Sequence, residues 1–357
     1  MRIVSPLLKH VVYPGLGKTG NLRWRRGTVP AVLTYHGLSP VGYSARSTAL
    51  DGHLITADTF RTQLHLLKSK YNVISPEEFR LWCNSEVTLP ARSVLLTSDD
   101  GLLNTFTDML PIIREFNVPF LFFVTGASTS EQRSMLWYEQ LYLWLQEGAN
   151  LCLRTPWREQ PYVAKTIPQK RSLWHQLVKK LSAFDAAARE AALDDVRIQI
   201  GISESWQAEY SQNEPSRRRF FMLNRSELQE LANAGMTIGA HTLSHPMLSQ
   251  MSEPAAWREI SESRTQLAKA IGREVWAFAF PFGTPEAVNG RDAELAQRAG
   301  FMCAFVNTES SLGFDKFQLP RIHVSAGMGL AELEAHLCGL HRSLHQKYAE
   351  AVGRSIA

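Results

Sequence analysis

A repeated alternation of short apolar segments with amphipathic ones constrains the fold of this chain more than any other feature. Most of the short segments are apolar at nearly every position, which is typical of parallel strands covered by helices. The stretches between them carry apolar residues at helical spacing, such as Phe60, Leu64 and Leu67. The segments expected to form strands are 31–35, 71–74, 93–96, 118–125, 236–240, 275–280, 301–306 and 319–324. This order predicts an α/β fold in which helices wrap a parallel sheet or barrel.

The alternation stops at about residues 127–222, where helical patterns dominate and no comparable apolar strand occurs. We therefore expect a main domain over 31–325 that is interrupted by a helical insertion or lid. Residues 1–30 are expected to be a lead-in, and 326–357 are expected to hold a C-terminal helix over 330–352.

Composition excludes several classes of protein. The chain has 357 residues, of which 45% are hydrophobic and 20% charged, as in ordinary globular proteins. A net charge of +4 is too weak to indicate nucleic-acid binding. Four cysteines without a CxxC pair argue against a cysteine zinc site and suit a reducing compartment.

The chain start lacks the apolar core of a secretory signal, and no run of about 18 apolar residues is present. We therefore expect a cytoplasmic protein. Lys18, Arg23, Arg25 and Arg26 form a basic cluster that can contact an anionic membrane surface. The competing interpretation is a solvated basic loop.

Polar residues follow the expected strands, beginning with Asp99, Asp100 and Gly101. Two carboxylates at the end of an apolar strand are costly to bury unless a positive group pairs with them. A divalent metal ion would supply that charge. The alternative is an Asp-Asp-Gly turn that caps the helix expected from Asn104 onward.

Three other strands also end in polar or special residues: His36, the pair His241 and His245, and the segment Pro281-Phe282-Gly283. Strand ends meet at one edge of a parallel fold, so these side chains can converge although they are distant in sequence. Two histidines and one carboxylate are the ligand set of a catalytic zinc site that keeps a position for water. The same set holds iron in oxygenases, and each histidine alone can be structural.

Hydrolysis at such a site needs a base for the proton of water and an acid for the leaving group. One aspartate can bind the metal while its neighbour serves as the base. Amide cleavage depends strongly on the acid, because an amine anion is a very poor leaving group. The candidate acids are His36 and His323.

These motifs resemble those of the polysaccharide deacetylase family, also called the NodB homology domain or carbohydrate esterase family 4. Thr97 to Gly101 matches the first family motif, T-F-D-D-G, with Ser98 in place of the aromatic residue. His241 to His245 matches the second motif, H-[ST]-x-x-H, at every position. Residues 110–126 and 280–283 look like the first crossover and the Pro-aromatic-Gly motif of the family.

The resemblance implies a distorted (β/α) barrel with seven or eight strands and an N-acetyl sugar as substrate. It implies Asp99 as the general base and a divalent ion, Zn²⁺ first and Ni²⁺, Co²⁺ or Fe²⁺ as alternatives. The implied ligands are Asp100, His241 and His245. The backbone N–H near Phe282 would help to hold the oxyanion.

Two departures from the family pattern matter. No clear late Leu-x-His motif is present, whereas Tyr35-His36 matches the early Tyr-His motif of members that resemble poly-N-acetylglucosamine deacetylases. We therefore expect His36 to be the acid, with His323 as second choice. Arg273 matches the usual family arginine poorly, so Arg321 is expected to pair with Asp99.

The expected function is metal-dependent N-deacetylation of an amino-sugar glycan or of its lipid- or nucleotide-linked precursor. Two alternatives stay open at this point. One is hydrolysis of another C–N bond, as in a formamide or cyclic imide, and the other is an inactive carbohydrate-binding module.

Overall fold

The computed structural model describes residues 8–18, 22, 24, 26–27, 29–309 and 315–343. Its centre is a parallel sheet with the strand order β10-β9-β8-β7-β4-β3-β1-β11, and β2 pairs with β3 beside this path. The strands are β1 (Ala31–Tyr35), β2 (Asn72–Val73), β3 (Ser93–Ser98), β4 (Leu121–Val124), β7 (Thr237–Ala240), β8 (Ala277–Ala279), β9 (Cys303–Val306), β10 (Leu319–Pro320) and β11 (Ile322–His323).

One residue, Arg321, joins the two ends of this sheet. β10 pairs with β9 in the register Leu319↔Phe305, and β11 pairs with β1 in the register Leu33↔Ile322. Only Arg321 lies between β10 and β11 in the chain. The sheet is therefore a nearly closed, distorted (β/α) barrel, and the predicted fold class is confirmed.

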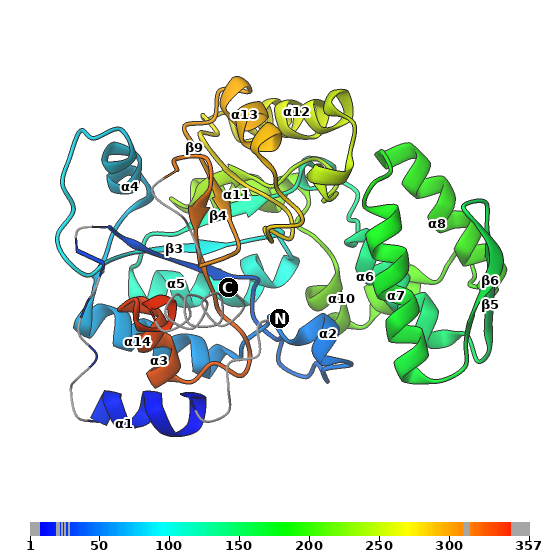
Figure 1. The fold of residues 1–357 in the computed structure, drawn as a ribbon, viewed down its shortest axis with the longest axis horizontal. Helices are drawn as coiled ribbons and strands as arrows, with labels where there is room; N and C mark the ends of the chain where they lie inside the picture. Colours follow the sequence, from blue (N-terminus) through cyan, green and yellow to red (C-terminus); the bar gives the residue numbers. More distant parts are fainter. Residues whose placement is uncertain are drawn as a thin grey trace, which may run out of the picture.

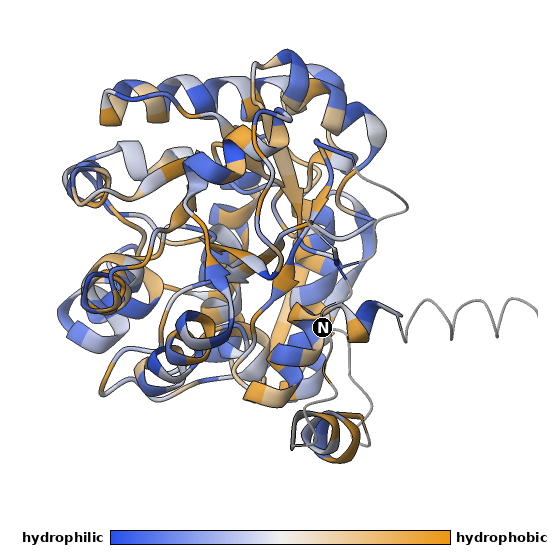
Figure 2. Ribbon diagram, turned by 90° about the vertical axis from the view of Figure 1, so that its left-hand side faces the viewer, coloured by the Kyte–Doolittle hydropathy of each residue, from blue (hydrophilic) through white to orange (hydrophobic). Residues whose placement is uncertain are grey.

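Helices surround the barrel, and their apolar sides face the strands (Figure 2). The long ones are α3 (Ala57–Lys70), α4 (Pro76–Cys83), α5 (Leu110–Phe116), α11 (Arg225–Asn233), α12 (Glu253–Ile271), α13 (Gly290–Arg298) and α14 (Leu330–Leu337). The short helical segments are η1 (Leu8–Val12), α1 (Tyr13–Lys18), α2 (Thr48–Asp51), η2 (Thr105–Met109), η3 (Gly126–Thr129) and η4 (Leu248–Gln250). Capping boxes at Ser75 and Asn224 begin α4 and α11, as their sequences predict.

Alternate residues of each strand face the two sides of the barrel wall. One set, which includes Leu33, Leu96 and Phe122, packs against the outer helices. The other set fills the interior, where Leu95 and Phe305 pack with further strand residues. Asp99 is four residues after Leu95 and therefore lies on the same side of the strand. Its side chain points toward the interior at the carboxyl end of β3.

The insertion forms a lobe beside the barrel with a hydrophobic cluster of its own (Figure 1, green). Its elements are α6 (Trp137–Glu147), β5 (Leu151–Thr155), β6 (Arg158–Ala164), α7 (Ile167–Leu181), α8 (Ala186–Ile200), α9 (Gln207–Gln212) and α10 (Glu214–Phe220). The antiparallel β5–β6 hairpin was not expected from the sequence. Its first strand alternates buried and exposed residues instead of forming an apolar run.

Two further expectations need correction. α14 ends at Leu337, and Gly339 with φ of +81° breaks the helix before it resumes at Leu340, so one continuous helix over 330–352 is wrong. Residues beyond 343 lie outside the described part. After Asn104 the chain forms the π-helix η2 before α5, and the Asn104 side chain accepts a hydrogen bond from the Leu38 N–H instead of capping.

The basic cluster near the N-terminus is described only in part, because Arg23 and Arg25 lie outside the described residues. Arg26 donates from Nε to the Leu337 carbonyl and from Nη2 to the His336 carbonyl, so its charge lies at the carboxyl end of α14. No helix in the described ranges is both long enough and apolar enough to span a bilayer.

A buried cluster of charges links the insertion to helix α2, which precedes α3. Arg219 is fully buried and donates from Nε to Asp51 Oδ1 at 2.7 Å and from Nη2 to Glu139 Oε1 at 2.8 Å. The same Nη2 reaches the Leu50 carbonyl at 3.0 Å. Because α2, α6 and α10 each contribute one charge, the cluster fixes their relative positions.

Replacing Arg219 by Met should lower the free energy of unfolding by about 3–5 kcal/mol, because two buried carboxylates then lose their cation. Denaturant titration followed by circular dichroism measures the change. Arg217 is exposed, and Arg217→Met is the matched control with an expected effect within about 0.5 kcal/mol. Equal losses for the two variants would contradict the role given to the cluster.

Candidate active site

Asp99 and Arg321 form a buried, bidentate ion pair at the top of the barrel. Arg321 Nη1 lies 2.6 Å from Asp99 Oδ1, and Nη2 lies 2.6 Å from Oδ2. The two side chains are buried, and the guanidinium lies over the rings of Phe123 and Phe305. Burial alone would raise the pKa of Asp99, but the charge of Arg321 and its hydrogen bonds hold it below its ordinary value. Asp99 is therefore an ionised acceptor at neutral pH.

Asp100, His241 and His245 bring three ligand atoms together beside this pair. Asp100 Oδ1 lies 3.6 Å from His241 Nε2 and 3.3 Å from His245 Nε2. His241 Nδ1 lies 2.7 Å from the Ala279 carbonyl, so Nδ1 carries the proton and Nε2 has a free lone pair. Burial favours the neutral carboxyl, but the two neighbouring histidines hold the pKa of Asp100 well below its usual range.

The two aspartates thus face different partners, and the Asp-Asp-Gly turn does not use its carboxylates to cap the following helix. Asp100 has φ of +72°, and Gly101 follows with φ of +77°. A Cβ at position 101 would lie 2.8 Å from Val124 Cγ1, so glycine is required there. This turn sends Asp99 toward Arg321 and Asp100 toward the histidines.

Backbone strain is concentrated at these strand ends. Among the described residues, positive φ in non-glycine residues occurs at Asp100, Thr242, His245 and Phe282 within the site. Outside it, the same feature occurs at Ser85, Arg92 and Asn117. Such conformations cost about 1–3 kcal/mol each and persist where surrounding contacts hold them.

The contacts that hold the His241–His245 loop come from the barrel and from the insertion. Glu259 of α12 accepts hydrogen bonds from the backbone N–H groups of Leu243 and Ser244 at 2.8 and 2.9 Å. Arg189 of α8 donates to the Ser244 carbonyl at 3.1 Å, and Trp137 Nε1 donates to the His245 carbonyl at 3.1 Å. The insertion is therefore a part of the structure that positions His245.

The donor set of Asp100, His241 and His245 fits a divalent metal ion. One carboxylate oxygen and one ring nitrogen from each of two buried imidazoles converge within 4.8 Å of one another, and His241 offers a free Nε2. A second group, Glu309, His336 and His341, meets the same distance limit. There the two imidazole rings lie 3.9 Å apart with an interplanar angle of 32°, and His336 already pairs with Glu309.

Three histidines gather next to these residues. The His36 ring lies 4.9 Å from the His323 ring and 5.2 Å from the His53 ring. His323 Nδ1 lies 3.3 Å from Asn307 Nδ2, while His36 Nδ1 is buried without a partner among the described residues. Burial lowers the pKa of His36 and lowers that of His323 to about 3, so both are neutral at neutral pH.

Two aromatic residues border the triad. The ring of Phe282 lies 4.9 Å from the His245 ring. Phe282 belongs to the Pro-Phe-Gly segment and has a φ of +61°. Tyr138 of α6 lies 5.2 Å from His245 and 5.9 Å from Phe282. Burial, reinforced by the charge of Asp100, raises the pKa of Tyr138 well above its ordinary value, so it stays protonated.

The structure therefore brings together every residue that the sequence singled out: Asp99, Asp100, His241, His245, His36, His323, Phe282 and Arg321. The expected pairing of Arg321 with Asp99 is present, which leaves Arg321 bound to protein instead of open to a substrate. Sequence reasoning missed His53, Tyr138, Glu259 and Arg189, none of which follows a barrel strand. Ser98, where an aromatic residue was expected, is buried with no partner for Oγ among the described residues.

Solved structures with a similar fold include two whose names describe a deacetylase and a de-N-acetylase. Streptococcus pyogenes deacetylase PplD, determined with acetate, is 18% identical with a TM-score of 0.53 over 85% of this chain and 96% of that one. IcaB from Ammonifex degensii is 17% identical with a TM-score of 0.54 over 87% and 98%. The de-N-acetylase from Aggregatibacter actinomycetemcomitans is 15% identical with a TM-score of 0.52 over 85% and 98%. At these identities the likeness shows the fold alone.

No curated protein matches the chain significantly. The sequence model of the polysaccharide deacetylase family matches residues 86–191 and 202–304, which together are more than half of the chain. The matched ranges contain Asp99, Asp100, His241 and His245. The chain therefore belongs to the polysaccharide deacetylase family.

Proposed function

We propose that this protein is a metal-dependent hydrolase that removes the N-acetyl group of an amino sugar. The substrate is a polysaccharide or its lipid- or nucleotide-linked precursor. The observation that carries the proposal is the position of the ionised Asp99 directly beside Asp100, His241 and His245, where three ligand atoms converge. Family membership supports the substrate class.

Asp100, His241 and His245 would hold the ion, with Zn²⁺ favoured and Ni²⁺, Co²⁺ or Fe²⁺ accommodated by the same donors. A bound divalent ion lowers the pKa of water and polarises the acetyl carbonyl. Asp99 accepts the proton of the attacking water, and Arg321 fixes the orientation of that carboxylate. The Phe282 backbone N–H is our candidate donor to the oxyanion.

His36 is the proposed proton donor to the leaving amine, and His323 is the alternative. Because both rings are neutral at rest, the imidazole must first accept a proton, and the proton that Asp99 takes from the attacking water is the one available to pass to the amine. In this proposal Asp99 is the base and His36 is the acid, and both act on an amide bound between them, as hydrolysis requires.

Acetate release from a panel of N-acetyl amino sugars tests the proposal. The panel contains free oligosaccharides, nucleotide-linked sugars and lipid-linked sugars, and an enzymatic acetate assay gives the readout. We expect release from at least one class, with loss of activity in the Asp99→Asn variant. Binding of these sugars without acetate release, with metal in place, would contradict an enzymatic function.

Substituting Asp100 by Ala should abolish stoichiometric metal binding, because the triad loses its only anionic ligand. Elemental analysis of the purified protein, by inductively coupled plasma mass spectrometry, measures the metal-to-chain ratio. Glu309→Gln in the second histidine group is the matched comparison and should retain the ion. Metal retained in Asp100→Ala but lost in Glu309→Gln would show that the assignment is wrong.

Substituting His36 by Ala should lower kcat by about 10²–10⁴-fold while metal content stays stoichiometric, because the general acid is removed. His323→Ala is the parallel variant, with a smaller expected loss. The test compares kcat of both variants on the best substrate of the panel. If His323→Ala shows the larger loss, the two roles are exchanged.

A further inference from the structure

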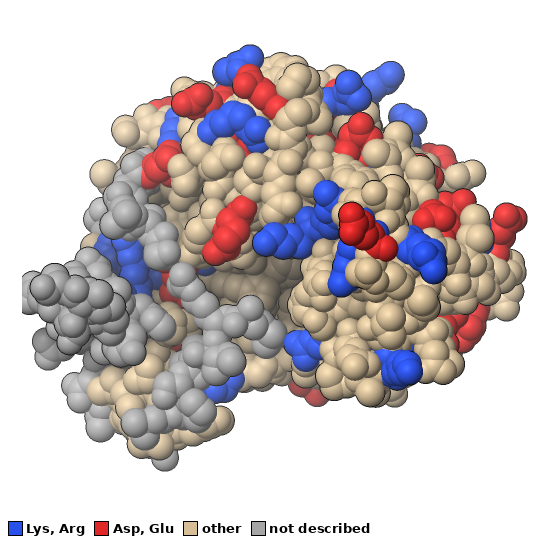
Figure 3. Space-filling view, turned by 45° about the vertical axis from the view of Figure 1, so that its right-hand side comes forward, with Lys and Arg blue, Asp and Glu red and all other residues tan. Residues whose placement is uncertain are grey.

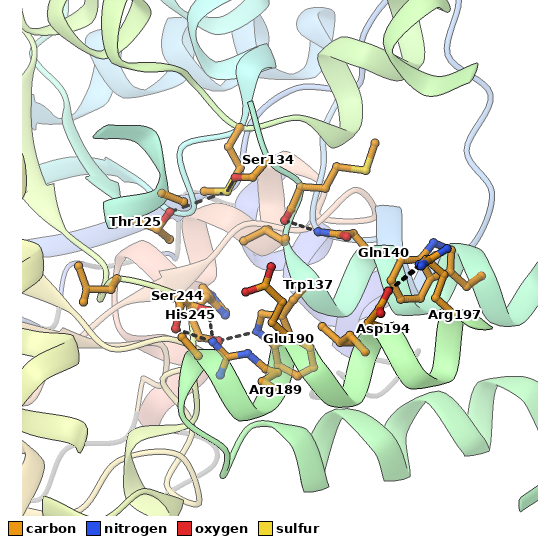
Figure 4. Close-up of a pocket in the computed structure, with 18 of the residues that line it drawn as sticks. Thr125, Ser134, Trp137, Gln140, Arg189, Glu190, Asp194, Arg197, Ser244 and His245 are labelled. Atoms are coloured by element: carbon orange, nitrogen blue, oxygen red, sulfur yellow. Dashed lines mark hydrogen bonds and ion pairs between the residues drawn. The ribbon is translucent and has the colours of Figure 1, made fainter. Parts of the chain in front are cut away.

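A cavity of about 370 Å³ lies between the insertion and the loop that carries His245 (Figure 4). Its walls come from three parts of the chain: the ends of β4 and β7, helix α6, and helix α8. The surface that carries the insertion is hollowed, and charged side chains stand at the rim of the hollow (Figure 3). Of the residues given catalytic or metal-binding roles above, His245 lines this cavity.

Indole rings form much of the apolar wall. Trp137, Trp144 and Trp206 line the cavity, and the half-buried Trp206 meets Trp144 edge to face at 5.3 Å. The face of an indole is electronegative and attracts polarised C–H groups. One side of a pyranose ring presents a row of such C–H groups, so this wall suits a sugar ring.

The polar groups of the cavity are suited to hydroxyl groups. Glu190 points its carboxylate into the cavity (Figure 4) and has no hydrogen bond or ion pair with any described residue. The hydroxyls of Thr125 and Ser134 both donate to the sulfur of Met222, which is a weak acceptor. These groups therefore remain available to accept hydrogen bonds from a ligand.

The charges of the wall balance, with Arg189 and Arg197 against Glu190 and Asp194, and so favour a ligand without a strong charge. Both arginines of the wall already bind protein groups: Arg189 donates to Ser244, and Arg197 donates to Asp194 and to the Ile202 carbonyl. Arg189 donates only to neutral groups, so its positive charge and the negative charge of Glu190 are the two charges of the wall without an ion-pair partner among the described residues. A neutral or amine-bearing polyol with an apolar face is the ligand class that fits aromatic walls and free acceptors together.

His245 connects this cavity to the metal-ligand triad. Its imidazole reaches Asp100, while its carbonyl accepts the hydrogen bond of Trp137 on the cavity side. We propose that the cavity is a saccharide subsite that receives a second sugar unit of the chain whose N-acetyl group is hydrolysed at the triad. This inference rests on the proposed function and assigns to the insertion a role in selecting polymeric over single-sugar substrates.

The test compares single sugars with chains in Glu190→Gln and Trp206→Ala. kcat/KM is measured for N-acetylglucosamine and for its β-1,4- and β-1,6-linked pentamers. Each variant should lower the ratio of pentamer to monomer kcat/KM by about tenfold, which corresponds to about 1.4 kcal/mol. Glu159→Gln, an exposed carboxylate of the β5–β6 hairpin outside the cavity, is the matched control and should leave the ratio unchanged.

A binding measurement separates the two proposals. Isothermal titration with the β-1,4- and β-1,6-linked pentamers of glucosamine, which carry no acetyl group to be hydrolysed, reports the subsite alone. Weaker binding to Glu190→Gln and Trp206→Ala supports the subsite, even if the wild-type protein releases no acetate and the proposed function fails. If both variants bind the pentamers as the wild type does, or if the wild type binds neither, the subsite is overturned.

Discussion

The ion pair between Asp99 and Arg321 is the interaction on which the rest of the structure depends. Arg321 is the residue between β10 and β11, so it stands where the two ends of the sheet meet. Its guanidinium crosses the interior to the carboxylate at the end of β3. Either charge would be strongly destabilising if it were buried here without the other. The same contact therefore closes the barrel and keeps Asp99 ionised.

The neighbouring triad depends on a different kind of support. The loop that carries its strained residues donates hydrogen bonds to Glu259 on a barrel helix and accepts them from Arg189 and Trp137 on the insertion. Tyr138 of the insertion also packs against His245. The insertion therefore helps to position His245, and the same packing forms the cavity beside it.

Local sequence patterns predicted the barrel and the strand-end residues, because apolar runs and capping boxes act over a few residues. Asp99, Asp100, His36, His241 and His245 could be found since each directly follows such a run. His53, Tyr138 and Arg189 could not, because only tertiary packing brings loops and the insertion to the strand ends. The β5–β6 hairpin and the break at Gly339 were missed for another reason. The alternation of buried and exposed residues in a short strand is a weak local signal, and so is a single glycine.

The central claim is that Asp100, His241 and His245 hold the ion that acts beside Asp99. Anomalous diffraction from crystals of the zinc-loaded protein, collected on both sides of the zinc absorption edge, tests it most directly. The account predicts one strong peak within about 2.0–2.2 Å of an Asp100 oxygen and of Nε2 of both histidines. A peak at Glu309, His336 and His341 with none at the triad would contradict it.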